Sequence, residues 1–288
     1  MSAIERYEVP RDVETAAEIL RGGAVTILAG GTDLMPQSKA GRVSFGKVLM
    51  NIRRIPELMG VAEADGMIRI GALTSIADLL ELDTVGRRLP VLWQAADQFA
   101  SGQIRNMGTI GGNICNASPA GDTLVPLLVL NAEVELASKA GGRLVTRRVP
   151  LRDFLLGPGR TARRPEELLT AVAVPVPPDG FRARFAKLGT RPALDISTVS
   201  VAVGAVVRGG AAEDVRVAFG AVAPRPIRGP RTEATLDGRP LAKAVIDAAA
   251  EVAHDEVTPI DDVRATAWYR RQMIHNLTKE VLSHVAAA

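Results

Sequence analysis

Two glycine-rich segments constrain the fold of this chain more than any other feature. AGGTDL (29–34) directly follows the apolar run AVTILA (24–29), which predicts a buried strand. MGTIGGNICNASPAGD (107–122) holds four glycines but keeps Ile110 and Ile114 between small residues, so it is not a disordered tract. Glycine lets a ligand approach the backbone, and consecutive N–H groups in such turns form an anion-binding concavity. Two such loops can hold one diphosphate between them, whereas ordinary tight turns would explain either segment alone.

Composition and charge exclude several classes of protein. The chain has 288 residues, enough for two or three domains with sizeable cores. Its 47% hydrophobic and 23% charged residues are typical of a soluble globular protein. The net charge is only +3 and no dense basic patch is evident, which argues against a nucleic-acid partner. No apolar run reaches membrane-spanning length and no signal core begins the chain, so we expect a cytoplasmic protein without membrane contact.

Residues that ligate metals are scarce. The single cysteine, Cys115, excludes an internal disulfide framework and a cysteine-ligated iron–sulfur cluster within this chain. The three histidines, His254, His275 and His284, all follow residue 253. Residues 1–253 therefore hold no histidine-based metal cluster and no serine-type triad.

Apolar periodicity and turn signals predict an α+β protein in three parts. RRIPEL and PPDG are the candidate boundaries, giving parts at 1–55, 56–177 and 178–288. Helices are predicted over 12–21, 76–82, 89–100, 123–131, about 240–254 and 265–285. Strands are predicted over 24–29, 47–52, 67–72, 132–138, 143–151, 168–177, 181–189, 196–207 and 215–223. A stripe that recurs every four residues of the last helix is interpreted as core: Tyr269, Met273, Leu277 and Val281.

One motif imitates a dinucleotide fingerprint. GPGRTA (157–162) fits G-x-G-x-x-[GA], but a true fingerprint opens a helix that meets the pyrophosphate. Pro158 lies inside the motif, Pro165 follows it, and no helical pattern begins there. We therefore predict a loop.

Six segments, in order, resemble one known family. They are LAGGTDL (28–34), RIGALTSIADL (69–79), QIRNMGTIGGNICNASPAGD (103–122), PEELLTAVAVP (165–175), RPALDISTVSVA (191–202) and YRRQMIHNLTKEVL (269–282). On these segments the chain resembles the FAD-binding (medium) subunits of the molybdenum hydroxylases, and looks closest to the xanthine dehydrogenase branch. The resemblance covers essentially the whole chain and is far more specific than a single glycine motif.

The resemblance implies a fold and a set of cofactor-binding residues. The fold would be a two-subdomain FAD-binding domain of the vanillyl-alcohol oxidase (PCMH) type followed by a C-terminal α+β domain. The first FAD loop would comprise Ile27, Leu28, Ala29, Gly30, Gly31, Thr32, Asp33 and Leu34, and the second Thr109, Ile110, Gly111, Gly112 and Asn113. Four single residues complete the set: Ala100 close to the flavin, Asp122 hydrogen-bonded to the ribityl chain, Leu169 against a ring system and Lys187 near the isoalloxazine edge.

Each single polar residue also has a simpler interpretation. Asp122 would cap the helix that follows it, Lys187 and Arg191 would be solvated strand residues, and Asp195 would be a surface turn residue. Cys115 is interpreted as a small buried residue rather than a redox group. If the complex reduces NAD⁺, Arg191 and Asp195 are candidates for the NAD⁺ side of the flavin.

The resemblance also implies a role in a larger complex. FAD would be noncovalent, and molybdopterin and [2Fe–2S] clusters would lie only on partner subunits. A large molybdopterin subunit and a small [2Fe–2S] subunit would join this chain in a dimer of heterotrimers. Electrons would pass through FAD to NAD or another acceptor during hydroxylation of a purine such as xanthine. Carbon monoxide or an N-heterocycle such as nicotinate remains an alternative substrate, and a self-contained FAD oxidoreductase or an assembly module that lost FAD are alternatives of other classes.

Overall fold

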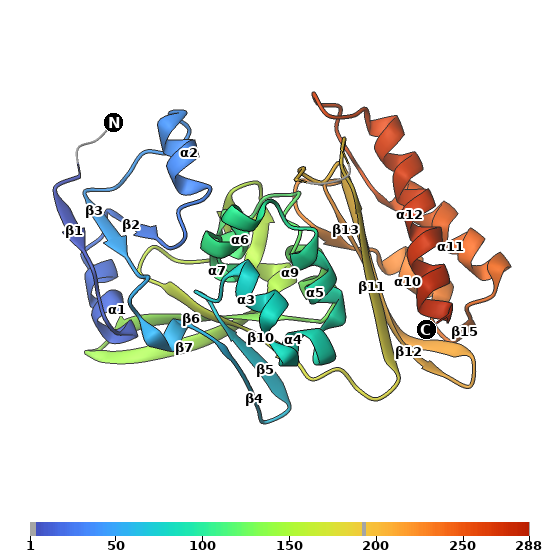
Figure 1. Ribbon diagram of the computed structural model, residues 1–288, viewed down its shortest axis with the longest axis horizontal. Coiled ribbons are helices and arrows are strands. Elements are labelled where there is room, and N and C mark those ends of the chain that lie inside the picture. The colour runs from blue at the N-terminus through green and yellow to red at the C-terminus, as the bar shows by residue number, and fades with distance from the viewer. Residues whose placement is uncertain (1–3, 192–193, 288) are drawn as a thin grey trace.

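The described residues fold around three larger β-sheets and one two-stranded ribbon, with a helical layer between the second and the third sheet (Figure 1). The computed structural model describes residues 4–191 and 194–287. In Figure 1 the N-terminal sheet lies at the left, the second sheet and its helices at the centre, and the third sheet at the right with the two long C-terminal helices on its outer face. Both five-stranded sheets are antiparallel and have helices packed against their faces, so the predicted α+β class is confirmed.

The N-terminal unit is a small parallel sheet with two helices. Its sheet has the order β1–β3–β2 and comprises β1 (Arg6–Glu8), β2 (Val25–Leu28) and β3 (Val48–Asn51); its helices are α1 (Val13–Arg21) and α2 (Leu34–Lys39). Asp12 caps the start of α1, because its carboxylate accepts a hydrogen bond from the Thr15 N–H. The strand predicted over 24–29 is half-buried along its whole length rather than buried.

Parallel strands in one register place all three strand ends at one edge of this sheet. Val48, at the start of β3, lies beside Arg6 of β1 and Val25 of β2. At the opposite end Leu28 lies beside Asn51. The segments that leave the carboxyl ends of β2 and β3 therefore begin side by side, as is usual where α/β sheets bind ligands.

The second unit is an antiparallel sheet covered by short helices. Its sheet has the order β4–β5–β10–β6–β7 and comprises β4 (Val61–Ala64), β5 (Met67–Gly71), β6 (Glu133–Ala140), β7 (Arg143–Pro150) and β10 (Leu168–Pro175). The helices are η1 (Pro56–Leu58), α3 (Ile76–Glu81), α4 (Asp83–Arg88), α5 (Pro90–Asp97), α6 (Gly102–Met107), α7 (Ile110–Asn116), α8 (Leu124–Val129) and α9 (Leu151–Phe154). Ser75 and Asp78 form a capping box at the start of α3.

The GPGRTA segment forms a short two-stranded ribbon and not a dinucleotide-binding turn. β8 (Leu155–Gly157) and β9 (Arg160–Thr161) pair antiparallel across Pro158 and Gly159. No helix begins within the motif, so the prediction of a loop is confirmed.

The third unit is an antiparallel sheet between two helical layers. It comprises β11 (Phe181–Leu188), β12 (Val199–Arg208), β13 (Ala211–Gly220), β14 (Ile227–Arg228) and β15 (Arg239–Pro240), with α10 (Pro230–Leu236), α11 (Lys243–Glu256) and α12 (Ala267–Ala287). α10, α11 and α12 cover one face (Figure 1), and α5 and α8 of the second unit pack on the other. Small residues make that second contact close, because a Cβ on Gly204 of β12 would lie 2.7 Å from Val129 Cγ1 of α8.

The expected core stripe on the last helix is wrong at its start. Tyr269 is 37% exposed, whereas Ile274, Val281 and Val285 are buried against the third sheet. Steps of four residues overshoot the 3.6-residue turn, so the stripe drifts around the helix and leaves the core at one end. The core of the N-terminal unit also includes Ala137 of the second sheet, and the boundaries at 1–55, 56–177 and 178–288 stay predictions.

Candidate functional site

The first glycine loop connects β2 to α2 at the carboxyl edge of the parallel sheet. Gly31 has φ +73°, which glycine adopts without strain. Within the described chain, none of the six N–H groups of residues 29–34 donates a hydrogen bond to another group of the protein. Residues 29–32 are half-buried, and polar groups that leave bulk water need a partner. The loop therefore offers a run of unused donors.

The second glycine segment has a different construction from the one expected. Residues 110–116 form α7, and the Thr109 side chain caps this helix by accepting from the Gly112 N–H at 3.0 Å. The Ile110 N–H donates to the Thr74 carbonyl and the Gly111 N–H to the Ala72 carbonyl. The expectation of consecutive free N–H groups is therefore wrong for residues 110–113; of residues 109–113, only the Thr109 N–H has no acceptor among the described residues.

Close packing explains why this segment needs glycines. A Cβ on Gly111 would lie 2.7 Å from the Cβ of Ala72, and one on Gly112 would lie 2.9 Å from the Thr109 hydroxyl. The backbone of α7 thus packs directly on the end of β5 and on its own cap. The main role of these two glycines is therefore to let the segment pack closely, and not to expose backbone N–H donors.

The two glycine segments touch each other. A Cβ on Gly30 would lie only 1.8 Å from the Met107 carbonyl oxygen, so the backbones of 28–34 and 107–109 are in direct contact. A Cβ on Gly108 would lie 3.5 Å from the Thr32 hydroxyl. The structure thus brings together two segments that are about seventy residues apart in sequence, and the free donors of the first lie beside the second.

A buried ion pair joins the second and third units. Lys187 Nζ lies 2.7 Å from Asp122 Oδ2, and the two side chains are only 9% and 8% exposed. The Ser197 hydroxyl donates to Asp122 Oδ1 at 2.6 Å. Burial raises the pKa of the Asp122 carboxyl, and the Lys187 ammonium and the Ser197 hydroxyl partly offset that rise. Lys187 is therefore not a solvated strand residue.

Asp122 does not cap the helix that follows it, because Thr123 occupies the N-cap position of α8 and no side chain caps it. The Thr123 hydroxyl instead donates to Asn113 Oδ1 at 2.6 Å. Hydrogen bonds and the chain itself thus connect the second glycine segment to the Asp122–Lys187 pair. At the start of β12, the buried Thr198 and Ser200 hydroxyls have no hydrogen-bond partner among the described residues.

Arg191 and Asp195 belong to the loop between β11 and β12. The Asp195 carboxylate accepts from the Thr190 hydroxyl at 2.6 Å and from the N–H groups of Thr190 and Arg191. The hydrogen bond from the Thr190 hydroxyl is the main cause that lowers the pKa of Asp195 to about 2. Asp195 therefore closes its own turn, as its simpler interpretation holds, while Lys187 Nζ also donates to the Asp195 carbonyl at 3.2 Å. Arg191 is exposed.

The remaining expected site residues differ in their surroundings. Ala100 is half-buried between α5 and α6 with φ +37°. Leu169 lies in β10 and is only 4% exposed, within the core of the second unit. It offers little surface to a ring system in this conformation, and its contact with a cofactor stays a prediction.

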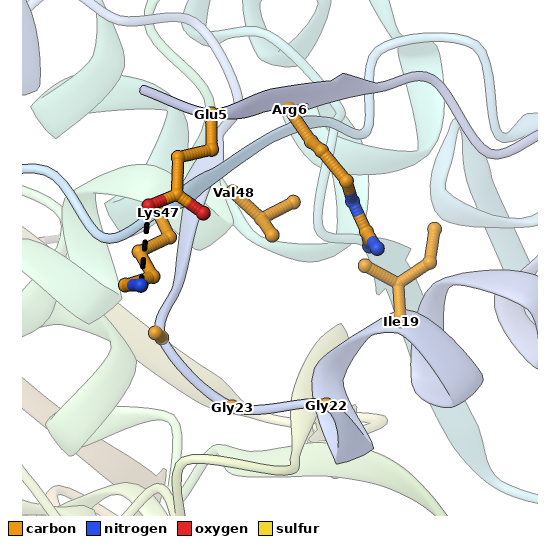
Figure 2. Close-up of a pocket in the computed structure, with 8 residues that line it drawn as sticks. Glu5, Arg6, Ile19, Gly22, Gly23, Lys47 and Val48 are labelled. Carbon is orange, nitrogen blue, oxygen red and sulfur yellow. Dashed lines mark ion pairs between the residues drawn. The ribbon is translucent and has the colours of Figure 1, made fainter. Parts of the chain in front are cut away.

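The hollow in Figure 2 lies at the wrong edge of the N-terminal sheet for this site. Arg6 and Val48 at the starts of β1 and β3, and Gly22 and Gly23 after α1, line it. A Lys47–Glu5 ion pair of 3.1 Å closes one side. The glycine loops leave the opposite ends of the strands, so this hollow is not part of the candidate site. No described residues form a group of three or more side chains suited to a metal ion.

Comparison with known families assigns the chain to a family. Residues 2–177 match the family described as "FAD binding domain in molybdopterin dehydrogenase", and residues 184–285 match the "CO dehydrogenase flavoprotein C-terminal domain". The chain belongs to the FAD-binding medium subunits of the molybdenum hydroxylases. This flavin subunit therefore carries an FAD-binding domain, followed by the C-terminal domain of that family.

Relatives along the whole chain agree with this assignment. The flavin subunit is 35% identical to the xanthine dehydrogenase FAD-binding subunit of Escherichia coli O157:H7, over 91% of this chain and 89% of the relative. It is 35% identical to the glyceraldehyde dehydrogenase medium chain of Sulfolobus acidocaldarius, over 97% and 98%. A structure of carbon monoxide dehydrogenase from Hydrogenophaga pseudoflava matches with a TM-score of 0.93 at 32% identity, covering 100% of this chain and 99% of that chain.

The residues of the flavin subunit fit the group that its family implies. The six unused N–H groups suit a diphosphate, because backbone donors bind its oxygens without long, mobile side chains. The close approach at Gly30 keeps the second segment beside these donors. Sequence reasoning missed Ser197 and Thr123, since no local pattern signals their hydrogen bonds to residues 75 and ten positions away.

Cys115 is expected to be chemically inert in the folded flavin subunit. It is half-buried on α7, and burial raises the pKa of its thiol to about 11. The thiolate, which is the reactive form, is therefore scarce at pH 8. An aromatic disulfide reagent at pH 8 should label native protein far more slowly than urea-unfolded protein. Labelling at the same rate in both states would contradict this prediction.

No helix within the described residues has both the length and the apolar character needed to span a membrane.

Proposed function

We propose that the flavin subunit binds FAD noncovalently where the two glycine segments meet, and that it transfers electrons within a molybdenum hydroxylase complex. The observation that carries this proposal is the run of six unused N–H groups at residues 29–34, which lies against Met107. A dinucleotide diphosphate has the charge and the acceptor oxygens to use such a run. The family assignment supports FAD as that dinucleotide.

Each part of the site has a distinct task in this proposal. The N–H groups of residues 29–34 and of Thr109 bind and orient the diphosphate. Asp122, Lys187 and Ser197 hold the C-terminal domain against the FAD-binding domain and place polar groups beside the ribityl chain and the isoalloxazine edge. Ala100 and Leu169 border the ring system. Bound FAD supplies a centre that accepts electrons singly or in pairs.

The flavin subunit requires partners for the complete reaction. A single cysteine is not enough to ligate an iron–sulfur cluster. We therefore place molybdopterin on a large subunit and [2Fe–2S] clusters on a small subunit, in a dimer of heterotrimers. Electrons pass from the clusters through FAD to NAD or another acceptor, with Arg191 and Asp195 on the NAD side. The overall reaction proposed is hydroxylation of a purine such as xanthine, which the xanthine dehydrogenase relatives support.

Purification of the native complex tests this proposal. We expect three kinds of subunit, with FAD that acid precipitation releases entirely into the supernatant. We also expect NAD⁺ reduction with xanthine that exceeds NAD⁺ reduction with carbon monoxide or nicotinate. Flavin that remains in the protein pellet would contradict noncovalent binding. Faster turnover with carbon monoxide or nicotinate would replace the purine assignment, and substrate turnover by the single chain would contradict the need for partners.

A further inference from the structure

We propose that Arg53 supplies the side-chain positive charge that pairs with the FAD diphosphate at the first glycine loop. This inference rests on the proposed function and adds a residue to it. Arg53 is not among the residues that the sequence indicates, because it lies outside both glycine segments.

The position of Arg53 follows from the parallel sheet. Asn51 is the last residue of β3 and lies beside Leu28, the last residue of β2. The Ile52 N–H donates to the Leu28 carbonyl at 3.1 Å, so the chain that leaves β3 begins beside the first glycine loop. Arg53 follows immediately. It therefore lies at the same carboxyl edge from which residues 29–34 present their unused N–H groups.

Contacts on both sides hold Arg53 in place. The Asn51 side-chain oxygen accepts from the Arg53 N–H at 3.0 Å, while Asn51 Nδ2 donates to the Tyr7 hydroxyl at 2.8 Å. The guanidinium reaches across to the second glycine segment, where Arg53 Nη2 lies 3.8 Å from Met107 Sδ. The carbonyl of this same methionine packs against Gly30. Arg53 thus extends from the end of β3 to the point where the two glycine segments meet.

The charge of Arg53 is available for a ligand. Other arginines of the N-terminal two units, such as Arg69 and Arg147, form ion pairs with glutamates. Among the described residues, by contrast, no carboxylate lies within ion-pair distance of the Arg53 guanidinium. The planar guanidinium fork matches two phosphate oxygens at once. The unused backbone donors carry no net charge. A nearby cation therefore adds the positive charge that pairs with the doubly charged diphosphate.

Comparison of FAD binding with riboflavin binding to the full chain separates the contribution of the diphosphate to affinity from that of the ring system. We expect Arg53→Met to weaken FAD binding about tenfold, the scale of a lost charge-assisted contact, and to leave riboflavin binding unchanged. Arg54→Met is the matched control, since it removes the same charge one residue away. It should change FAD affinity less than about twofold. Arg53→Lys should retain part of the affinity, because it keeps the charge and loses the fork.

Isothermal titration calorimetry at 0.1 M salt measures all four proteins, with circular dichroism as the check on folding. Equal FAD affinities for Arg53→Met and Arg54→Met would overturn the role of Arg53 and leave the proposed function standing. An equal loss of riboflavin affinity in Arg53→Met would also overturn it, because the effect would then not be on the diphosphate. Failure of the unaltered chain to bind FAD at all would overturn both the role of Arg53 and the proposed function.

Discussion

Gly30→Ala is expected to abolish FAD binding, raising the Kd more than about a hundredfold. The new Cβ would lie 1.8 Å from the Met107 carbonyl oxygen, far below the 3.0 Å that Cβ atoms keep from other heavy atoms. The backbone fixes the position of the Cβ, and the carbonyl oxygen is itself a backbone atom, so no side-chain rotation relieves the clash. The two glycine segments must separate, and the unused N–H groups then no longer lie beside Met107.

Graded glycine variants make this prediction specific. Gly108→Ala should weaken FAD binding less, because its Cβ would lie 3.0 Å from the Ile104 carbonyl and 3.5 Å from the Thr32 hydroxyl. Gly86→Ala is the matched control, since its Cβ in α4 would meet only Trp93, at 3.9 Å. Titration calorimetry and flavin absorbance after gel filtration rank the FAD affinities of these three variants. Unchanged FAD affinity in folded Gly30→Ala would contradict a cofactor site at this contact.

Lys187→Met is expected to destabilise the folded chain by about 3–5 kcal/mol in the free energy of unfolding. It leaves the Asp122 carboxylate buried between two domains without its cation. Arg87→Met is the matched control, because the Arg87–Asp83 pair is largely exposed and its loss should cost less than about 1 kcal/mol. Urea denaturation of the three proteins at pH 7 measures the difference.

The loss in the free energy of unfolding that Lys187→Met causes (its stability deficit) should depend on pH in a definite direction. Burial already raises the pKa of Asp122 above its ordinary value, and Lys187 limits that rise. Without Lys187 the folded-state pKa rises further, so protonation of Asp122 favours the folded state. The deficit should therefore be largest at pH 8 and shrink as the pH falls toward the pKa of Asp122. A deficit that grows on acidification, or one no larger than that of Arg87→Met, would contradict a buried ion pair at the domain contact.

The predictable parts of the fold are those that local chemistry determines. The Asp12 cap and the Ser75–Asp78 capping box follow from side chains three residues from the N–H groups they accept from. The α7 helix could not be predicted from local sequence, since Gly111 and Gly112 are poor helix formers. Tertiary hydrogen bonds to Thr74 and Ala72 and the Thr109 cap hold that helix instead.

The candidate site was predictable only in part for the same reason. The glycine segments are visible in the sequence, and their resemblance to a known family indicated FAD. Their contact at Gly30 and Met107 depends on how the N-terminal sheet packs against α6, which no local pattern encodes. The Asp122–Lys187 pair joins residues that are 65 positions apart on different domains. The free N–H groups of residues 29–34 likewise become distinguishable from those of α7 only once every backbone partner is known.

A crystal structure of the flavin subunit with bound FAD tests the central claim most directly. We predict diphosphate oxygens within hydrogen-bond distance of several N–H groups of residues 29–34, with the contact between Gly30 and Met107 intact beside the diphosphate. A diphosphate bound elsewhere, for example in the hollow beside Arg6 and Lys47, with residues 29–34 in contact only with water, would contradict this account.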